Sequence, residues 1–307
     1  MTTSTERALA YLAANATAKK LNQKYHAALA VLAYDFTLLA STPGLKFLQR
    51  APQKFGYDAA VYFHAASGVL AFVNRGTDGL RSMKDWIESS AAALTARFDG
   101  PLKASVLFAI DTIKKISSAK GLAGVKIDAV TEVNCTGHSW GGALSEAQVA
   151  LTQAIGAKNG LAISQAFYGT GFASAGFADA IRAYAAAEGV QIEDDMHWLV
   201  NHFIRGADAI LLQPNHKLLG EFYAIPGIYL SGQVPSANGR GFEYGLNAPI
   251  LTNHDAGLYF DQFELRGPKH LFQKRNGSFL LCDGIVPRKT RFGTNQPETQ
   301  IMGTVYP

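Results

Sequence analysis

Hydrophobic and polar positions in the first quarter of the chain predict a helical segment followed by two strands. An Ala- and Leu-rich stretch over residues 4–39 lacks Pro and Gly, which favours helix. Residues 41–44 (STPG) then break the pattern. Two apolar runs over 59–65 and 69–74 are joined at Ser67-Gly68, a pair typical of a hairpin turn. We therefore expect an N-terminal helical segment at 1–45 that leads into an antiparallel pair of strands.

The rest of the pattern alternates between helix-like and strand-like stretches. Helices are predicted over 81–98, 103–117, 142–155 and 177–188, and strands over 129–135, 161–168 and 197–204. This alternation implies crossover connections and a mainly parallel sheet, which is the α/β class. No repeat, linker or shift in composition marks a boundary, so we predict one domain over 1–307. The tail at 267–307 contains one apolar run, 278–282, and has no predicted role.

Composition and charge exclude some function classes. Hydrophobic residues make up 48% of 307, enough for a sizeable core, and 28 basic against 24 acidic residues leave a net charge of +4. So small an excess does not indicate nucleic-acid binding. Basic residues do cluster between 266 and 291, either as an ordinary solvated surface or as a patch attracted to anionic lipid. Cys135 fits a buried thiol, although a disulfide with Cys282 is also open.

Targeting signals do not stand out in the sequence. No apolar run approaches the length of a membrane span, and residues 1–7 lack the basic-then-apolar order of a secretory signal. We therefore expect a cytoplasmic protein, or one that leaves the cell by a leaderless route or after its leader has been trimmed.

Residues 137–141 (GHSWG) carry the most informative pattern, G-x-S-x-G. A serine hydroxyl is a weak nucleophile at neutral pH and has to be presented to a base. The motif does this in a sharp turn between a strand and a helix, where the flanking glycines avoid side-chain clashes. Here an apolar strand is predicted before the motif and a helix of small residues after it. Ser139 is therefore the predicted nucleophile, the alternatives being a structural turn or a decayed site.

These residues resemble the class 3 lipase family, the fungal-type triacylglycerol lipases and their relatives. The segments that carry the resemblance, in chain order, are 71–77 (AFVNRGT), 84–87 (KDWI), 137–142 (GHSWGG), and 167–171 (FYGTG) with 177–178 (FA). Asn74 stands where the family usually has Phe, and Trp140 where Leu is commoner. The match covers roughly residues 57–260 and implies an α/β-hydrolase fold with a helical lid.

The resemblance implies further roles for residues around the nucleophile. Thr77 and the backbone N–H of Trp140 would form the oxyanion hole. The predicted helix after residue 80 would be the lid, with Met83, Trp86 and Ile87 covering an apolar site when closed. A permanently packed surface helix is the alternative for that segment. His138 would be structural, and no metal or organic cofactor is implied.

The acid and base are expected in the order Ser, Asp, His. Asp208 follows the predicted strand 197–204 and resembles the family's acid, whereas Asp194 and Asp195 precede that strand at its wrong end. His254 resembles the family's His-x-x-Tyr base, with a longer spacing to Tyr259. His270 lacks comparable context, and His216 lies only eight positions after Asp208.

The sequence thus predicts a serine carboxylic-ester hydrolase of lipase-like type, acting through an acyl-enzyme and the triad Ser139, Asp208 and His254. Glyceride or phospholipid esters are the expected substrates, phospholipase A1 activity being one form, with transient contact at a lipid interface and no nucleic-acid partner. Two alternatives stay open: an acyltransferase that uses the same triad, and a non-catalytic binding protein that retains the fold.

Overall fold

A computed structural model describes most of the chain in separate stretches. The described residues are 3–52, 57–76, 100–192, 196, 199–205, 217–225, 254–262, 269–273, 279–281 and 305–306. The N-terminal segment is helical, as predicted, but it is divided into α1 (Ser4–Ala14), α2 (Gln23–Leu32) and α3 (Phe36–Ala40). Each helix begins where a side-chain oxygen, of Thr3, Asn22 or Asp35, accepts backbone N–H groups of the first turn. These capping residues explain why the stretch is not one long helix.

Within the described residues, a sheet of ten strands runs in sequence order from β1 to β10. The strands are β1 (Leu45–Arg50), β2 (Ala59–His64), β3 (Val69–Asn74), β4 (Glu132–His138), β5 (Ala166–Phe172), β6 (Val200–Arg205), β7 (Glu221–Ile225), β8 (Lys269–Gln273), β9 (Phe279–Leu281) and β10 (Val305–Tyr306). Strands β3 to β7 are parallel, and antiparallel pairs flank them on both sides. The predicted hairpin is β2–β3, and the central sheet is parallel, as the α/β prediction requires.

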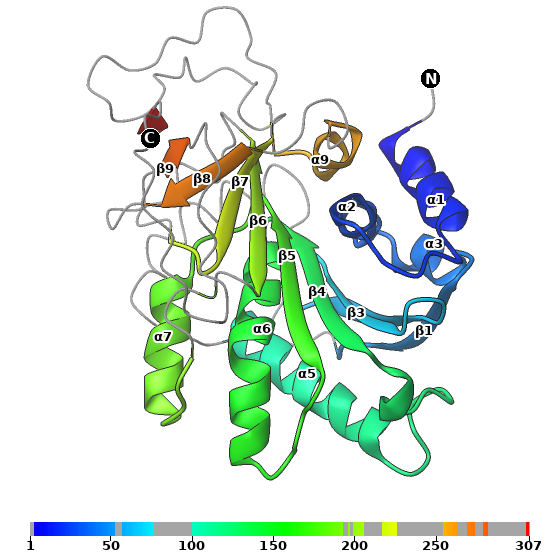
Figure 1. Ribbon diagram of the computed structural model, residues 1–307, viewed down its shortest axis with the longest axis vertical. Helices are drawn as coiled ribbons and strands as arrows, with labels where there is room; N and C mark the ends of the chain where they lie inside the picture. Colours follow the sequence, from blue (N-terminus) through cyan, green and yellow to red (C-terminus); the bar gives the residue numbers. More distant parts are fainter. Residues whose placement is uncertain are drawn as a thin grey trace, which may run out of the picture.

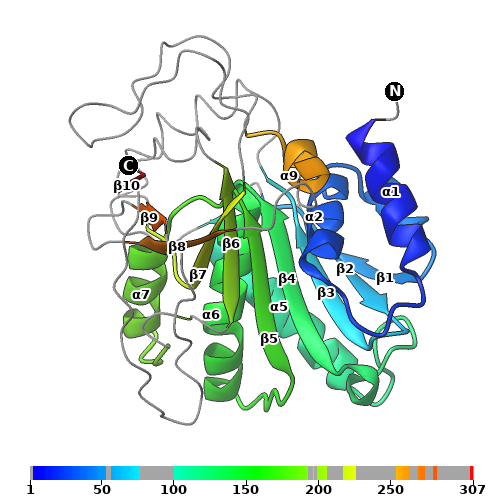
Figure 2. The same ribbon diagram turned by 45° about the horizontal axis from the view of Figure 1, so that its top comes forward.

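Helices cover both faces of the parallel strands (Figures 1 and 2). Besides α2, they are α5 (Pro101–Ser117), α6 (Trp140–Lys158), α7 (Ala178–Ala187) and α9 (Ala256–Gln262), with a short 3₁₀ turn at Ile127–Ala129. Successive residues of β4 point to opposite faces. Thr136 donates to the His26 carbonyl of α2, while α6 packs against β3, β4 and β5. The core therefore lies in two layers, one on each side of the sheet.

The hydrophobic runs that predicted the central elements are the most deeply buried parts of the molecule. Every residue of β2 and β3 is buried, as expected for strands covered on both faces. Cys135, in the middle of β4, is a free and fully buried thiol, and burial raises its pKa. Among the described helices, none is both long and apolar enough to cross a membrane.

Candidate active site

Ser139 lies in the turn between the end of β4 and the start of α6, where its backbone adopts φ +58° and ψ −123°. A positive φ is rare for a residue with a side chain and costs on the order of 1–3 kcal/mol, so the surrounding structure must impose it. The turn places Ser139 at the N-terminus of a 19-residue helix. Strand, strained serine and helix in this order are the nucleophile elbow of the α/β-hydrolase fold, as the motif predicted.

The glycines on either side of Ser139 let three backbones approach closely. A Cβ atom at Gly137 would overlap the backbone of Gly141, and one at Gly141 would overlap the carbonyl of Asn74 at the end of β3. Because backbone atoms occupy this space, no side chain could be accommodated by a small rearrangement. The G-x-S-x-G pattern is therefore a packing requirement where β3, β4 and α6 meet.

Hydrogen bonds fix the peptide groups of Ser139. Its N–H donates to the Phe172 carbonyl at 2.8 Å, and its own carbonyl accepts from Gly142 at 3.0 Å and Ala175 at 3.2 Å. These contacts join the elbow to the end of β5 and the loop that follows it. The residue is 3% exposed. Trp140 comes next as the first residue of α6, so its amide lies in the first turn of that helix.

His254 lies beside the elbow, immediately before α9. Its ring stacks obliquely on that of His138, the neighbour of Ser139, with 4.6 Å between centroids and 49° between planes. Tyr259 of α9 adds edge contacts to His138 at 5.8 Å and to Phe172 at 6.0 Å. His254 is 7% exposed, so it is held within the protein and not presented on a free surface loop. The chain thus brings the predicted base against His138, the residue that precedes the predicted nucleophile.

Tyr34, just after α2, supports the elbow from the other side. Its hydroxyl is hydrogen-bonded to His138 Nδ1 at 2.9 Å, and the guanidinium of Arg75 lies 5.9 Å from its ring centroid. A Cβ atom at Gly76 would meet both this hydroxyl and the His138 carbonyl, and would lie 3.3 Å from Ser139 Cβ. Gly76 therefore packs directly on the elbow, and the predicted oxyanion residue is the next one in the chain.

Asn74 joins the end of β3 to α6 through a buried polar network. Its buried amide donates to Ser145 Oγ at 3.0 Å and to Gln148 Oε1 at 2.7 Å, both on α6, while its Oδ1 accepts from the Tyr57 hydroxyl at 3.2 Å. The end of β3 is thus attached to α6 by polar contacts where the family usually places an apolar ring. A buried network of this kind stabilises only if its members are satisfied, as they are here.

A second polar chain lies behind the elbow and is fully buried. His202 on β6 is hydrogen-bonded through Nδ1 to Ser174 Oγ at 2.8 Å and donates from Nε2 to the Leu219 carbonyl at 2.8 Å. Glu146 of α6 lies 3.4 Å from the same Nε2 and accepts from the Leu219 N–H at 2.9 Å. Burial raises the pKa of Glu146, against the lowering effect of His202. All three side chains are inaccessible to solvent, so this Ser–His–Glu chain joins elements together and does not form a second reaction centre.

The other predicted site residues fall outside the described part of the chain. This applies to Asp208, Thr77, the lid residues Met83, Trp86 and Ile87, and the rivals Asp194, Asp195 and His216. His270 lies on β8. The strand before Asp208 is described, however: β6 ends at Arg205. Because β4, β5 and β6 are parallel, their carboxyl ends lie at the same edge of the sheet, which is the edge that carries Ser139.

The sequence patterns did not identify Tyr34, Glu146, Ser174 or His202 as residues of the site. Their partners are distant in sequence and no short motif joins them, so the pattern of hydrophobic and polar residues could not indicate these contacts. A charged Glu146 within the apolar stretch after the elbow was the one available hint, since buried carboxyls need partners. In the part of the chain that the structure describes, no three His, Cys, Asp or Glu side chains are grouped so as to hold a metal ion.

Comparison with known proteins gives matches in structure but not in sequence. The chain matches no family model and no curated protein sequence. Similar solved structures include the Penicillium expansum triacylglycerol lipase, at 12% identity and a TM-score of 0.44 over 66% of this chain and 78% of that one. The Rhizomucor miehei lipase–propeptide complex follows at 19% and 0.40 (66% and 67%), and the Yarrowia lipolytica Lip2 lipase at 17% and 0.40 (65% and 76%). These are proteins of the type that the motifs resemble, and the fold assignment rests on the strand order and the elbow.

Proposed function

We propose that this protein is a serine hydrolase that cleaves carboxylic esters through an acyl-enzyme on Ser139. One observation carries the proposal: Ser139 has a strained backbone at a glycine-lined strand–helix turn, and His254 is stacked on the residue next to it. A purely structural turn has no need for a serine at φ +58°, where glycine would be unstrained. The strain presents the hydroxyl, which is what nucleophilic catalysis requires.

The reaction would proceed in two halves. The Ser139 hydroxyl attacks the ester carbonyl carbon while its proton passes to His254, and a tetrahedral oxyanion forms. Collapse of this intermediate breaks the bond to the alcohol, which leaves with the proton from His254. Water then attacks the acyl-enzyme, with His254 again taking the proton and returning it to Ser139 as the carboxylic acid departs.

Stabilisation of the oxyanion is assigned to the Trp140 amide and to Thr77. The first-turn amides of α6 are directed toward developing negative charge, and the helix dipole favours an anion there. The contact between Gly76 and Ser139 supports a role for Thr77, which follows Gly76 in the chain. Asp208 is proposed as the acid that orients His254, since β6 ends three residues before it at the edge of the sheet that bears the elbow.

The proposed substrates are acyl esters of the glyceride or phospholipid class. This part rests on the motif resemblance and on the apolar residues Met83, Trp86 and Ile87, which would face lipid in an open state. Contact with a lipid interface would then be part of the catalytic cycle. A smaller soluble ester is the substrate if those residues are permanently packed.

The test is a series of p-nitrophenyl esters from acetate to palmitate, with wild type, Ser139→Ala and the double variant Trp86→Ser/Ile87→Ser, each checked for folding by circular dichroism. The proposal predicts hydrolysis by wild type and a loss of about 1000-fold or more in Ser139→Ala. The double variant should lose activity on long esters and retain it on acetate. A folded wild type that is inert on every ester would refute the proposed activity.

A further inference from the structure

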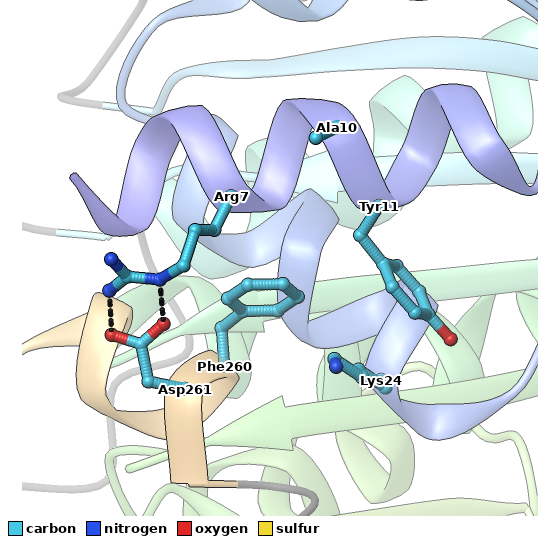
Figure 3. Close-up of a pocket in the computed structure, with 6 residues that line it drawn as sticks. All are labelled: Arg7, Ala10, Tyr11, Lys24, Phe260 and Asp261. Carbon is cyan, nitrogen blue, oxygen red and sulfur yellow. Dashed lines mark hydrogen bonds and ion pairs between the residues drawn. The ribbon is translucent and has the colours of Figure 1, made fainter. Parts of the chain in front are cut away.

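The helix that follows His254 is held from outside by the N-terminal helix. Asp261 of α9 accepts two hydrogen bonds from Arg7 of α1, 3.0 Å from Nε to Oδ1 and 2.6 Å from Nη2 to Oδ2, and a third from Ser4 Oγ at 2.7 Å. Figure 3 shows the paired contact of Arg7 with Asp261. Burial disfavours ionisation of Asp261, but the bonds from Arg7 and Ser4 outweigh it and lower its pKa. A bidentate guanidinium–carboxylate pair also fixes orientation.

Beyond the ion pair, α1 and α9 meet through one pair of aromatic rings beside an open pocket. Tyr11 of α1 meets Phe260 of α9 edge to face at 5.9 Å, and Lys24 of α2 lies 4.6 Å and 5.1 Å from the centroids of these two rings. Around them lies a pocket of about 510 Å³, lined by Arg7, Ala10, Tyr11, Lys24, Phe260 and Asp261 (Figure 3). Because this pocket separates part of the two helices, the ion pair of Arg7 with Asp261 is one of the few direct polar contacts between α1 and α9.

The two ends of this attachment are firmly placed. On one side, α1 is anchored by Ala8 and Leu12, which are fully buried in the core. On the other side, Asp255 Oδ1 accepts from the Gly257 N–H at 2.6 Å in the first turn of α9, directly after His254. A Cβ atom at Gly257 would lie 2.7 Å from Ser4, so the start of α9 is in direct contact with the start of α1.

Successive residues of α9 connect the N-terminal helix to the elbow. Tyr259 points inward to His138 and Phe172, whereas Phe260 and Asp261 point outward to α1. Any movement of α9 away from α1 would therefore shift both Tyr259 and His254 relative to Ser139. In both overall views α9 lies beside α1 and α2 (Figures 1 and 2).

We infer that the N-terminal helix positions the catalytic base, with Arg7 and Asp261 acting as positioning residues for His254. This inference rests on the proposed function of Ser139 and His254. Because the ion pair is partly exposed, reversing its charge can loosen α9 without disturbing the core.

The test reverses the charge of each partner in the full-length protein. Arg7→Glu places two carboxylates together, and Arg7→Glu/Asp261→Arg restores an opposite pair. Lys158→Glu is the matched control, because Lys158 forms a comparable exposed ion pair with Glu188 at 2.9 Å near the far end of α6. Two quantities are measured: the rate constant for labelling of Ser139 by a fluorophosphonate, and amide hydrogen exchange over residues 254–262.

The inference predicts that Arg7→Glu slows labelling about fivefold to tenfold, as expected for an ion pair replaced by a like-charge pair. Hydrogen exchange should accelerate over 254–262 and stay unchanged in β4 and α6. The double variant should recover to within about threefold of wild type, and Lys158→Glu should match wild type. Labelling and exchange that are unchanged in Arg7→Glu would overturn the inference, as would a double variant no better than the single one.

The labelling rate and the hydrogen exchange together distinguish a failure of this inference from a failure of the proposed function. If wild type itself does not react with the fluorophosphonate, the proposed function fails. Hydrogen exchange over 254–262 then still decides whether Arg7 holds the segment that carries His254. If wild type reacts but Arg7→Glu reacts equally fast, the function stands and the positioning role is wrong.

Discussion

The rings of His138 and His254 lie 4.6 Å apart, and this contact joins the elbow to a helix far along the chain. His138 is held in turn by Tyr34, so three residues from separate parts of the sequence converge beside Ser139. Because His254 is nearly enclosed, its ring has few alternative orientations. The base proposed here is thus placed by packing before any substrate binds.

Replacing His254 by Ala is expected to reduce kcat for ester hydrolysis by about 100- to 10,000-fold, because proton transfer from Ser139 would lose its acceptor. The comparison is with His270→Ala, which alters the rival histidine and should stay within about twofold of wild type. Steady-state kinetics on a short p-nitrophenyl ester checks both variants. Equal losses in the two, or a loss confined to His270→Ala, would reject His254 as the base.

The elements that the sequence predicted well are those whose signal is local. The hairpin at 59–74, the helix at 103–117 and the strand–elbow–helix around Ser139 each follow from apolar spacing with turn residues at the right places. The strand predicted at 161–168 begins later, at Ala166, because the apolar Leu161 and Ile163 that suggested a strand pack against the core from the preceding loop. β7, β8 and α9 were not predicted, since all three are short: the two strands depend on their neighbours in the sheet, and α9 depends on its packing against α1 and α2.

The site shows the same division between local and long-range information. The glycine motif identified Ser139, and family resemblance pointed to His254. Tyr34, His202 and Glu146 could not be inferred, because their roles arise from contacts across the fold. The catalytic roles of Ser139, His254 and Asp208, and those of Thr77 and the lid residues, are predictions for experiment.

Asn74→Leu is predicted to lower the free energy of unfolding by about 2–3 kcal/mol. The leucine has nearly the same size but removes one hydrogen bond each from Gln148, Ser145 and Tyr57. A buried polar group left unsatisfied costs about 1–3 kcal/mol, and the remaining partners of these three residues limit the total loss. Urea unfolding followed by circular dichroism measures the difference. A variant as stable as wild type would mean that apolar packing at this site fully replaces the network.

Glu146→Gln is predicted to become increasingly stable relative to wild type as pH rises. Burial raises the pKa of Glu146 above its ordinary value of 4.5. The stability that the protonated carboxyl contributes is therefore full below pH 4.5 and is lost as pH rises through the folded-state pKa. Gln keeps the acceptor for the Leu219 N–H and does not ionise.

Unfolding free energies of the two proteins at several pH values between 4 and 8 test this dependence. The difference in favour of Glu146→Gln should grow across the range. A difference that is constant with pH would show that Glu146 ionises in the folded protein as easily as in the unfolded one.

His26 is predicted to make the protein sensitive to acid between pH 6.5 and 4. Burial lowers its pKa from 6.5 to about 4, so the folded state holds a neutral ring while the unfolded state takes up a proton. Stability is full above pH 6.5 and is lost as pH falls toward 4, by about 3 kcal/mol in all. His26→Leu should flatten this part of the stability profile, and an unchanged slope would contradict the assignment.

The central claim is that Ser139 is a nucleophile, and covalent labelling tests it most directly. Wild type and Ser139→Ala are treated with a fluorophosphonate and examined by intact mass and peptide mapping. The account predicts one added phosphonyl group in wild type, located on the peptide that contains Ser139, and none in the variant. Labelling that persists in Ser139→Ala, or a folded wild type that takes up no probe, would contradict it.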